Sequence, residues 1–160
     1  MTLTANETLA RRLYPDTDWD DGSVYVSGYG PMVEAAGEVL LWITTGSYQG
    51  DYHVLVRGPG ADFGYISIGF GSCAGCDALQ ACDTAEEIGR LAEGIQFGIH
   101  WEVDAAAMRK WLLERDWEVQ WMYSDFEEFK EFLSKALKIV GADADVIEQF
   151  IDGLVKDNDS

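Results

Sequence analysis

The sequence predicts an α+β fold, in which an antiparallel β-meander of about four or five strands packs against C-terminal helices. Two observations predict this fold. Up to Phe70 the apolar and aromatic residues form short strand-like segments, whereas from Thr84 onward they recur at helical spacing. The connections GSYQGD and GPGAD are also too short for the crossovers that parallel strands need, so antiparallel pairing is expected.

The 160 residues are expected to form a single globular domain, residues 1–160. Apolar residues make up 48% of the chain and aromatic residues 12%, which is enough for a packed core and argues against global disorder. The N-terminus lacks a long apolar stretch, and no 18 apolar residues run together. Export and membrane insertion are therefore not expected, and the predicted location is the cytoplasm.

The first half of the chain contains one predicted helix and four predicted strands. Residues 4–14 are expected to form a short helix that ends at Pro15 and the acidic turn after it. The predicted strands are rich in Val, Ile, Leu and aromatic residues, and Gly-containing turns separate them. They cover residues 23–27, 39–45, 52–57 and 63–70.

The second half is predicted to be mostly helical. A helix should begin after Thr84, because Thr84 and Glu87 have the spacing of a capping box. Its apolar face consists of Ile88, Leu91, Ala92, Ile95 and Ile99. Further helices are expected over residues 104–114, over residues 126–137 with a stop at Gly141, and around residues 146–154. Alternating apolar residues predict a short strand over 117–123.

Charge is the strongest global signal, with 29 acidic against 11 basic residues and a net charge of −18. A phosphate backbone would be repelled, so no direct binding of nucleic acid is expected. The excess serves either solubility or the binding of a basic protein, as a nucleic-acid mimic does. The acidic residues expected to bind such a partner lie in the helical half: Glu127, Glu128, Glu131, Asp143, Asp145 and Glu148.

All three cysteines lie in the segment GFGSCAGCDALQACD, between a predicted strand and a predicted helix. An odd number of cysteines without a signal peptide favours reduced thiols or a metal site over a disulfide framework. A zinc ion needs four ligands, and His53 is closer by reach than His100, which follows a long helix. The predicted metal ligands are Cys73, Cys76, Cys82 and His53.

Two other interpretations of the cysteines stay open. Cys82 precedes a helix N-terminus, which lowers the pKa of a thiol, although Asp77 and Asp83 oppose this effect. The cysteines could instead be small structural side chains beside a glycine-rich turn. No signature of a hydrolase or of a nucleotide-binding loop surrounds them, so no catalytic residue is predicted.

Strand parity places the turn after Thr45 and the loop after Phe70 at the same end of the predicted sheet. The two loops would then form one surface, on which the predicted ligand-binding residues are Tyr48, Gln49, Asp51 and Asp77. The alternative is a purely structural pair of glycine-rich loops.

The motifs SYQGDY and GSCxGCDALQAC, read here within residues 42–52 and 64–82, resemble a group of small bacteriophage and bacterial proteins with no assigned function. The similarity extends from about Trp42 through Trp121. It implies no catalytic residues. A phage origin would imply a host-directed interaction, such as inhibition of a nucleic-acid-binding defence protein by an acidic decoy surface.

Two classes of function follow. The first is an acidic, non-enzymatic interaction protein, such as a phage-encoded inhibitor or nucleic-acid mimic that acts on a basic protein in the host cytoplasm and needs no cofactor. The alternative is a small metal-, thiol- or ligand-dependent protein, with its site at the cysteine loop and the turn from Tyr48 to Asp51. A monomer or a homodimer is expected in either case.

Overall fold

The computed structural model describes residues 2–20, 24–117 and 126–154, and it has an α+β fold. A four-stranded antiparallel sheet has the order β1-β2-β3-β4. Its strands are β1 (Glu38–Gly46), β2 (Gly50–Arg57), β3 (Phe63–Phe70) and β4 (His100–Glu102). The described helices are α1 (Ala5–Leu13), α2 (Gly30–Glu34), α3 (Ala85–Gly98), α4 (Ala105–Glu114), α5 (Phe126–Ile139) and α6 (Ala144–Asp152). The predicted meander over the first three of these strands is confirmed.

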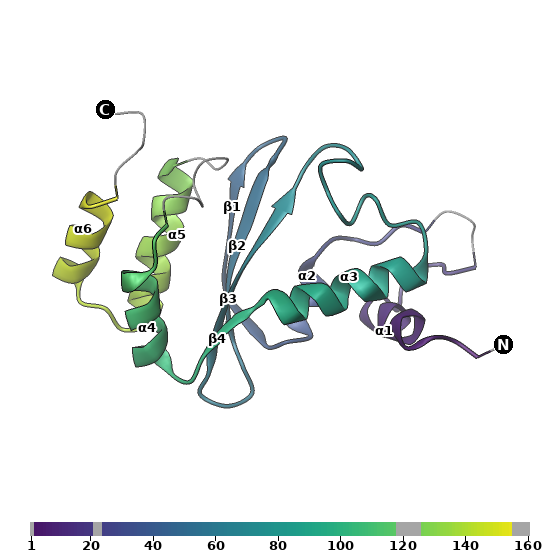
Figure 1. The fold of residues 1–160 in the computed structure, drawn as a ribbon, viewed down its shortest axis with the longest axis horizontal. Coiled ribbons are helices and arrows are strands. Elements are labelled where there is room, and N and C mark those ends of the chain that lie inside the picture. The colour runs from purple at the N-terminus through teal and green to yellow at the C-terminus, as the bar shows by residue number, and fades with distance from the viewer. Residues whose placement is uncertain (1, 21–23, 118–125, 155–160) are drawn as a thin grey trace.

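Helices cover both faces of the sheet (Figure 1). On one side lie α4, α5 and α6, which correspond to the predicted C-terminal layer. On the other side lie α1, α2 and α3. This second layer was not expected from the sequence, because the packing was assigned to the C-terminal helices alone.

The alternation along β2 divides the core between the two layers. Val54 and Val56 face the first cluster, which includes Ile88 and Ala92 of α3. Leu55 faces the second cluster, whose helical part includes buried Phe129 of α5. Because successive strand residues point to opposite faces, one buried strand supports both cores. The other buried side chains of α5 are Phe132, Leu133, Ala136 and Leu137.

Local signals fix the helix ends. The Thr84 side chain accepts a hydrogen bond from the Glu87 N–H at 3.1 Å, as expected for a cap at the start of α3. After α5, Gly141 adopts φ +87°, and the Ala142 N–H donates to the Leu137 carbonyl at 2.9 Å. This left-handed conformation suits glycine, and it confirms the predicted stop at Gly141.

One expected strand is wrong, two short elements were not predicted, and one expected strand is not tested by the described residues. Residues 24–27 of the predicted first strand have no strand structure, and residue 23 lies outside the described residues. The short elements α2 and β4 were not predicted, because one helical turn and three strand residues are too short to give a periodic pattern. Apart from Trp117, the predicted strand over 117–123 lies outside the described residues.

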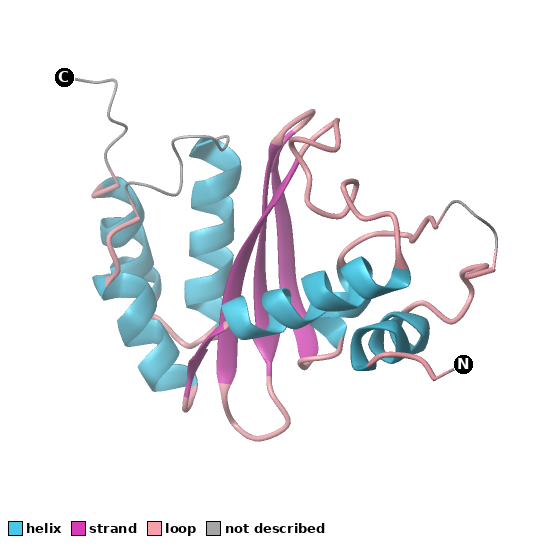
Figure 2. Cartoon of the chain, turned by 45° about the vertical axis from the view of Figure 1, so that its right-hand side comes forward, coloured by secondary structure: helices cyan, strands magenta, loops and turns pink. Residues whose placement is uncertain are grey.

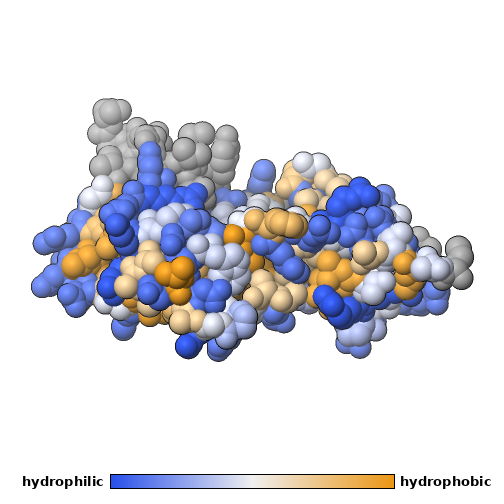
Figure 3. Space-filling view, turned by 60° about the horizontal axis from the view of Figure 1, so that its bottom comes forward, coloured by the Kyte–Doolittle hydropathy of each residue, from blue (hydrophilic) through white to orange (hydrophobic). Residues whose placement is uncertain are grey.

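Hydrophilic residues separate the apolar patches on the molecular face drawn in Figure 3. Within the described part of the chain, no helix combines the length and the apolar character needed to cross a bilayer.

Candidate functional site

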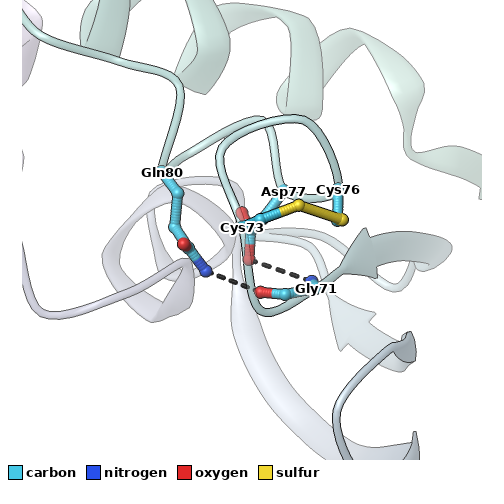
Figure 4. The surroundings of a disulfide bond; sticks show 5 residues. All are labelled: Gly71, Cys73, Cys76, Asp77 and Gln80. Atoms are coloured by element: carbon cyan, nitrogen blue, oxygen red, sulfur yellow. Dashed lines mark hydrogen bonds between the residues drawn. A yellow bond between two sulfur atoms is a disulfide. The ribbon is translucent and has the colours of Figure 1, made fainter.

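The loop after β3 contains a disulfide between Cys73 and Cys76 (Figure 4). Both cysteines are exposed, and a tight turn joins them, in which the N–H groups of Cys76 and Asp77 donate to the Cys73 carbonyl at 3.0 and 3.1 Å. The turn packs closely against Gly71, where an added Cβ would lie 2.2 Å from the Cys76 Cβ. The expectation of reduced thiols is therefore wrong for this pair, because the three-residue separation lets the turn bring the two sulfurs together.

Asp77 turns inward from this loop and is 8% exposed. Its Oδ1 accepts hydrogen bonds from the Tyr29 hydroxyl at 2.6 Å and from the Leu79 N–H at 3.0 Å. Its Oδ2 accepts from the Gly71 N–H at 3.3 Å, while Gln80 Nε2 donates to the Gly71 carbonyl at 2.6 Å (Figure 4). Asp77 was predicted to bind a ligand, but in this structure it connects the loop to the rest of the protein.

Sequence reasoning missed Tyr29, although it completes this network from 48 residues away. Burial and the hydrogen bond to Asp77 raise the pKa of the Tyr29 hydroxyl, so it stays protonated and acts as a donor. No local motif marks Tyr29, because its partner is determined only when α2 packs beside the loop. Next to this network a cavity of about 550 Å³ extends from residues 24–29 to Cys82 and Ile88.

Cys82 remains a free cysteine and is half-buried. Burial raises the pKa of its thiol, and the carboxylates of Glu87, Asp83 and Asp77 raise it further. The interpretation that the helix N-terminus lowers this pKa is therefore not supported, whereas the opposing effect expected of Asp77 and Asp83 is present, together with burial. Its Sγ donates to the Ala78 carbonyl at 3.4 Å.

His53 does not join the cysteines. It is fully buried on the side of the sheet that α5 covers, with its ring centroid 5.1 Å from Phe129 and 5.4 Å from Phe132. Its Nδ1 forms a hydrogen bond with the Tyr65 hydroxyl at 2.8 Å. The four predicted metal ligands thus do not converge, and the described residues contain no group of three or more His, Cys, Asp or Glu side chains that could hold a metal ion. His53 was chosen as a ligand because its predicted strand lies next to the cysteine loop. The alternation of side chains along β2 instead directs it to the face of the sheet that α5 covers.

The turn between β1 and β2 lies at the same end of the sheet as the cysteine loop, since Gly50 pairs with Phe70. Gly46 (φ +83°) and Gly50 permit this turn, because added Cβ atoms would lie 2.3 Å from the Gln49 carbonyl oxygen and 1.7 Å from the Thr45 carbonyl oxygen. Tyr48 is 82% exposed, and Gln49 is exposed beside it.

Of the four predicted ligand-binding residues, Tyr48 and Gln49 thus face solvent, whereas Asp77 is buried in its own network. Asp51 is half-buried, and its backbone exchanges hydrogen bonds with the Thr45 side chain at 3.1 and 3.2 Å. The two loops share one end of the sheet, but the Asp77 carboxylate is engaged in its own buried hydrogen-bond network while Tyr48 and Gln49 are exposed.

The six acidic residues predicted to bind a partner fall into two sets. On α5, Glu127 pairs with Lys130 at 2.8 Å and Glu131 with Lys135 at 2.7 Å. Glu128 Oε2 accepts the Gly46 N–H at 3.0 Å, so it helps to hold α5 against β1. The second set, Asp143, Asp145 and Glu148, is exposed at and within α6.

A groove of about 490 Å³ lies between α5 and α6. Its lining combines apolar side chains with acidic residues and one lysine: Ser134, Lys138, Ala142, Ala144, Ile147, Glu148, Ile151 and Asp152. None of the α6 side chains is fully buried, and the helix lies at the outer side of the molecule (Figure 1). An apolar floor with carboxylates beside it suits a segment that carries both apolar and basic side chains.

Comparisons of this chain with protein families, with curated proteins and with solved structures found no match.

Proposed function

We propose that this chain is an acidic, non-enzymatic interaction protein that binds a basic, amphipathic segment of another protein in the groove between α5 and α6. The observation that carries the proposal is that apolar Ile147 and Ile151 line the same groove as the carboxylates of Glu148 and Asp152. A phage-encoded inhibitor or nucleic-acid mimic that acts on a basic host protein is the form of this function that the sequence resemblance implies.

The charges on α6 support the proposal. In the described part of the chain, Asp143, Asp145 and Glu148 form no ion pair, unlike Glu127 and Glu131 on α5. A basic segment would therefore meet carboxylates that do not first have to leave an internal partner. The net charge of −18 adds long-range attraction, which speeds the encounter with a basic protein.

The test measures the binding of a fluorescent helical peptide composed of Lys and Leu by anisotropy. We expect affinity to fall at least about tenfold between low and physiological salt, because screening removes the attraction. Glu148→Lys, a reversal within the groove, should weaken binding several-fold more than Glu93→Lys, a matched charge reversal on exposed α3 across the sheet. Salt-insensitive binding, or equal effects of the two reversals, would contradict the proposal.

The exposed Cys73–Cys76 disulfide favours a second candidate, a thiol-dependent function at the cysteine loop. A thiolate of a small thiol such as glutathione would attack one sulfur and release the other as a thiolate, which takes up a proton. A second thiol would resolve the mixed disulfide, so that two thiols are oxidised as the protein disulfide gains two electrons.

This candidate is tested by equilibration in glutathione buffers, followed by alkylation and mass spectrometry. We expect Cys73 and Cys76 to be reduced together, and Cys82 to label slowly at neutral pH because its thiol pKa is raised. Cys82→Ser should leave the exchange unchanged, whereas Cys73→Ser should abolish it. A disulfide that resists excess glutathione would exclude this function.

A further inference from the structure

Half of β3 forms an open sheet edge. On one side β2 pairs with β3 along its whole length, from Phe63 to Phe70. On the other side β4 pairs only with Phe63, Gly64 and Tyr65. Among the described residues no strand pairs with residues 66–70 on this side, so the outward backbone N–H and C=O groups there lack a strand partner.

A groove of about 520 Å³ follows this open edge. Most of its lining comes from β3 and α3, and single residues come from the start of α2, the cysteine loop, β4 and the end of α4. The lining residues are Tyr29, Tyr65, Ile66, Ser67, Ile68, Gly69, Ala78, Leu91, Gly94, Ile95, Gly98, His100 and Arg115. In Figure 2, α3 crosses in front of the sheet and leads into β4 at its edge.

The helical wall of the groove leaves room beside the edge. A Cβ added at Gly94 would meet no atom within 4 Å. On the edge itself, Gly69 is exposed and Ser67 is half-buried, so the backbone is not hidden beneath large side chains. Five edge residues span about 16 Å, at about 3.3 Å per residue, which is the length of a short added strand.

One end of the groove carries positive charge in an otherwise acidic protein. The Arg115 guanidinium lies 4.8 Å from the ring centroid of Trp111 and 4.6 Å from that of Trp117. It also lies 5.6 Å from the ring centroid of Tyr65, which belongs to β3. The described residues offer Arg115 no carboxylate partner, whereas neighbouring His100 contacts Glu102 at 2.9 Å. These rings hold the cation in place for an anionic group of a ligand.

The direction of β3 determines which end of a bound strand reaches Arg115. An antiparallel addition would run from Phe70 toward Tyr65, so its C-terminus would arrive where β4 begins and Arg115 lies. A parallel addition would bring a positively charged N-terminus to the same place. We infer that the open half of β3 binds the extended C-terminal segment of a partner protein, added antiparallel with its terminal carboxylate at Arg115.

This site is distinct from the groove between α5 and α6 and prefers the opposite charge. The helix α3 stands beside this edge, so the groove suits a narrow peptide better than the sheet of a second copy of this chain. The occupant is therefore a narrow extended peptide and not another sheet.

The test uses a synthetic library of random octapeptides with free C-termini. An enriched peptide is then measured by anisotropy as the free acid and as the C-terminal amide. We expect the free acid to bind at least about tenfold more tightly, and Arg115→Met to remove that difference. Arg57→Met, at an exposed site at the end of β2, should change neither affinity. Circular dichroism monitors the fold of each variant.

Hydrogen exchange supplies a second readout, since the bound peptide should slow the exchange of amides within residues 66–70. Gly94→Gln, which adds a side chain to the groove wall without a clash at its Cβ, should weaken both peptide forms. Added salt should weaken binding of the free acid only slightly. Salt screens the attraction to Arg115, but it also screens the repulsion between the peptide carboxylate and the net negative charge of the protein. Binding of a basic segment, in contrast, should weaken steeply. The inference is overturned if no peptide binds, if acid and amide bind equally, or if sedimentation detects a dimer that protects residues 66–70 without peptide.

Discussion

His53 is a residue whose surroundings determine its chemistry. Burial lowers the pKa of its imidazole to about 4, and the charge of Arg115 contributes in the same direction. The ring therefore stays neutral in the core and packs against Phe129 and Phe132. The neutral imidazole is thus a core side chain and does not join the cysteines as a metal ligand.

We expect the free energy of unfolding to fall by roughly 1 kcal/mol between about pH 7.5 and about pH 5.5 because of His53. The imidazole of the unfolded chain takes up a proton below its ordinary pKa of 6.5, whereas the folded one does so only near 4. Its contribution is thus fully present above the unfolded pKa and is lost as pH falls through this window. Urea titrations of the wild type and of His53→Gln measure it, and an equal pH dependence in both proteins would contradict it.

At the scale of elements, α1 and α3 pack through a close backbone approach. An added Cβ at Gly89 would lie 1.9 Å from the Asn6 carbonyl oxygen. Glu86 of α3 also accepts hydrogen bonds from the Thr4 hydroxyl and from Asn6 Nδ2, the latter at 3.0 Å. The two helices are therefore joined at one crossing point, which only a glycine at position 89 permits.

We expect Gly89→Ala to destabilise the protein by about 2 kcal/mol or more, because the added methyl group must push the helices apart. Gly94→Ala on the same helix is the matched control. It should stabilise the protein by up to about 1 kcal/mol, since its Cβ meets nothing and alanine favours the helix. Thermal unfolding measures the change in stability of both variants. A change of the same sign in the two variants would show that the close approach of α1 does not determine the effect of Gly89→Ala.

At the scale of the whole molecule, the net charge of −18 acts against the folded state. The 11 basic residues cannot pair with all 29 acidic ones, although ion pairs such as that of Glu86 with Arg90 at 3.4 Å are present. Most of the negative charge is thus balanced by solvent ions. Compaction brings these charges together, which costs free energy that screening reduces.

We expect the melting temperature to rise by several degrees as sodium chloride increases from about 20 to 300 mM, because the Debye length shortens several-fold over this range. Calorimetry at constant pH measures the change, and an uncharged osmolyte serves as the control for general solvent effects. A melting temperature that falls with salt would mean that local ion pairs outweigh the repulsion.

The strands β1 to β3 and the helices α3, α4 and α5 could be predicted from the sequence, because each is long enough to show its period and is bounded by turn or capping residues. The elements α2 and β4 could be identified only in the tertiary structure, since such short elements form only where neighbours pack against them. The cysteine loop was located correctly. Its disulfide, the burial of Asp77 and the part played by Tyr29 depend on contacts that local sequence does not specify.

The sequence by itself determined the α+β class, the antiparallel meander and the acidic charge, since these follow from periodicity, connection length and composition. Only the tertiary structure decided which side chains meet. Strand alternation separated His53 from the cysteines, and the short β4 left half of β3 without a strand partner on the side away from β2 among the described residues. The physical reason is that contacts between residues distant in the chain depend on how layers stack and where strands end, and neither leaves a local pattern.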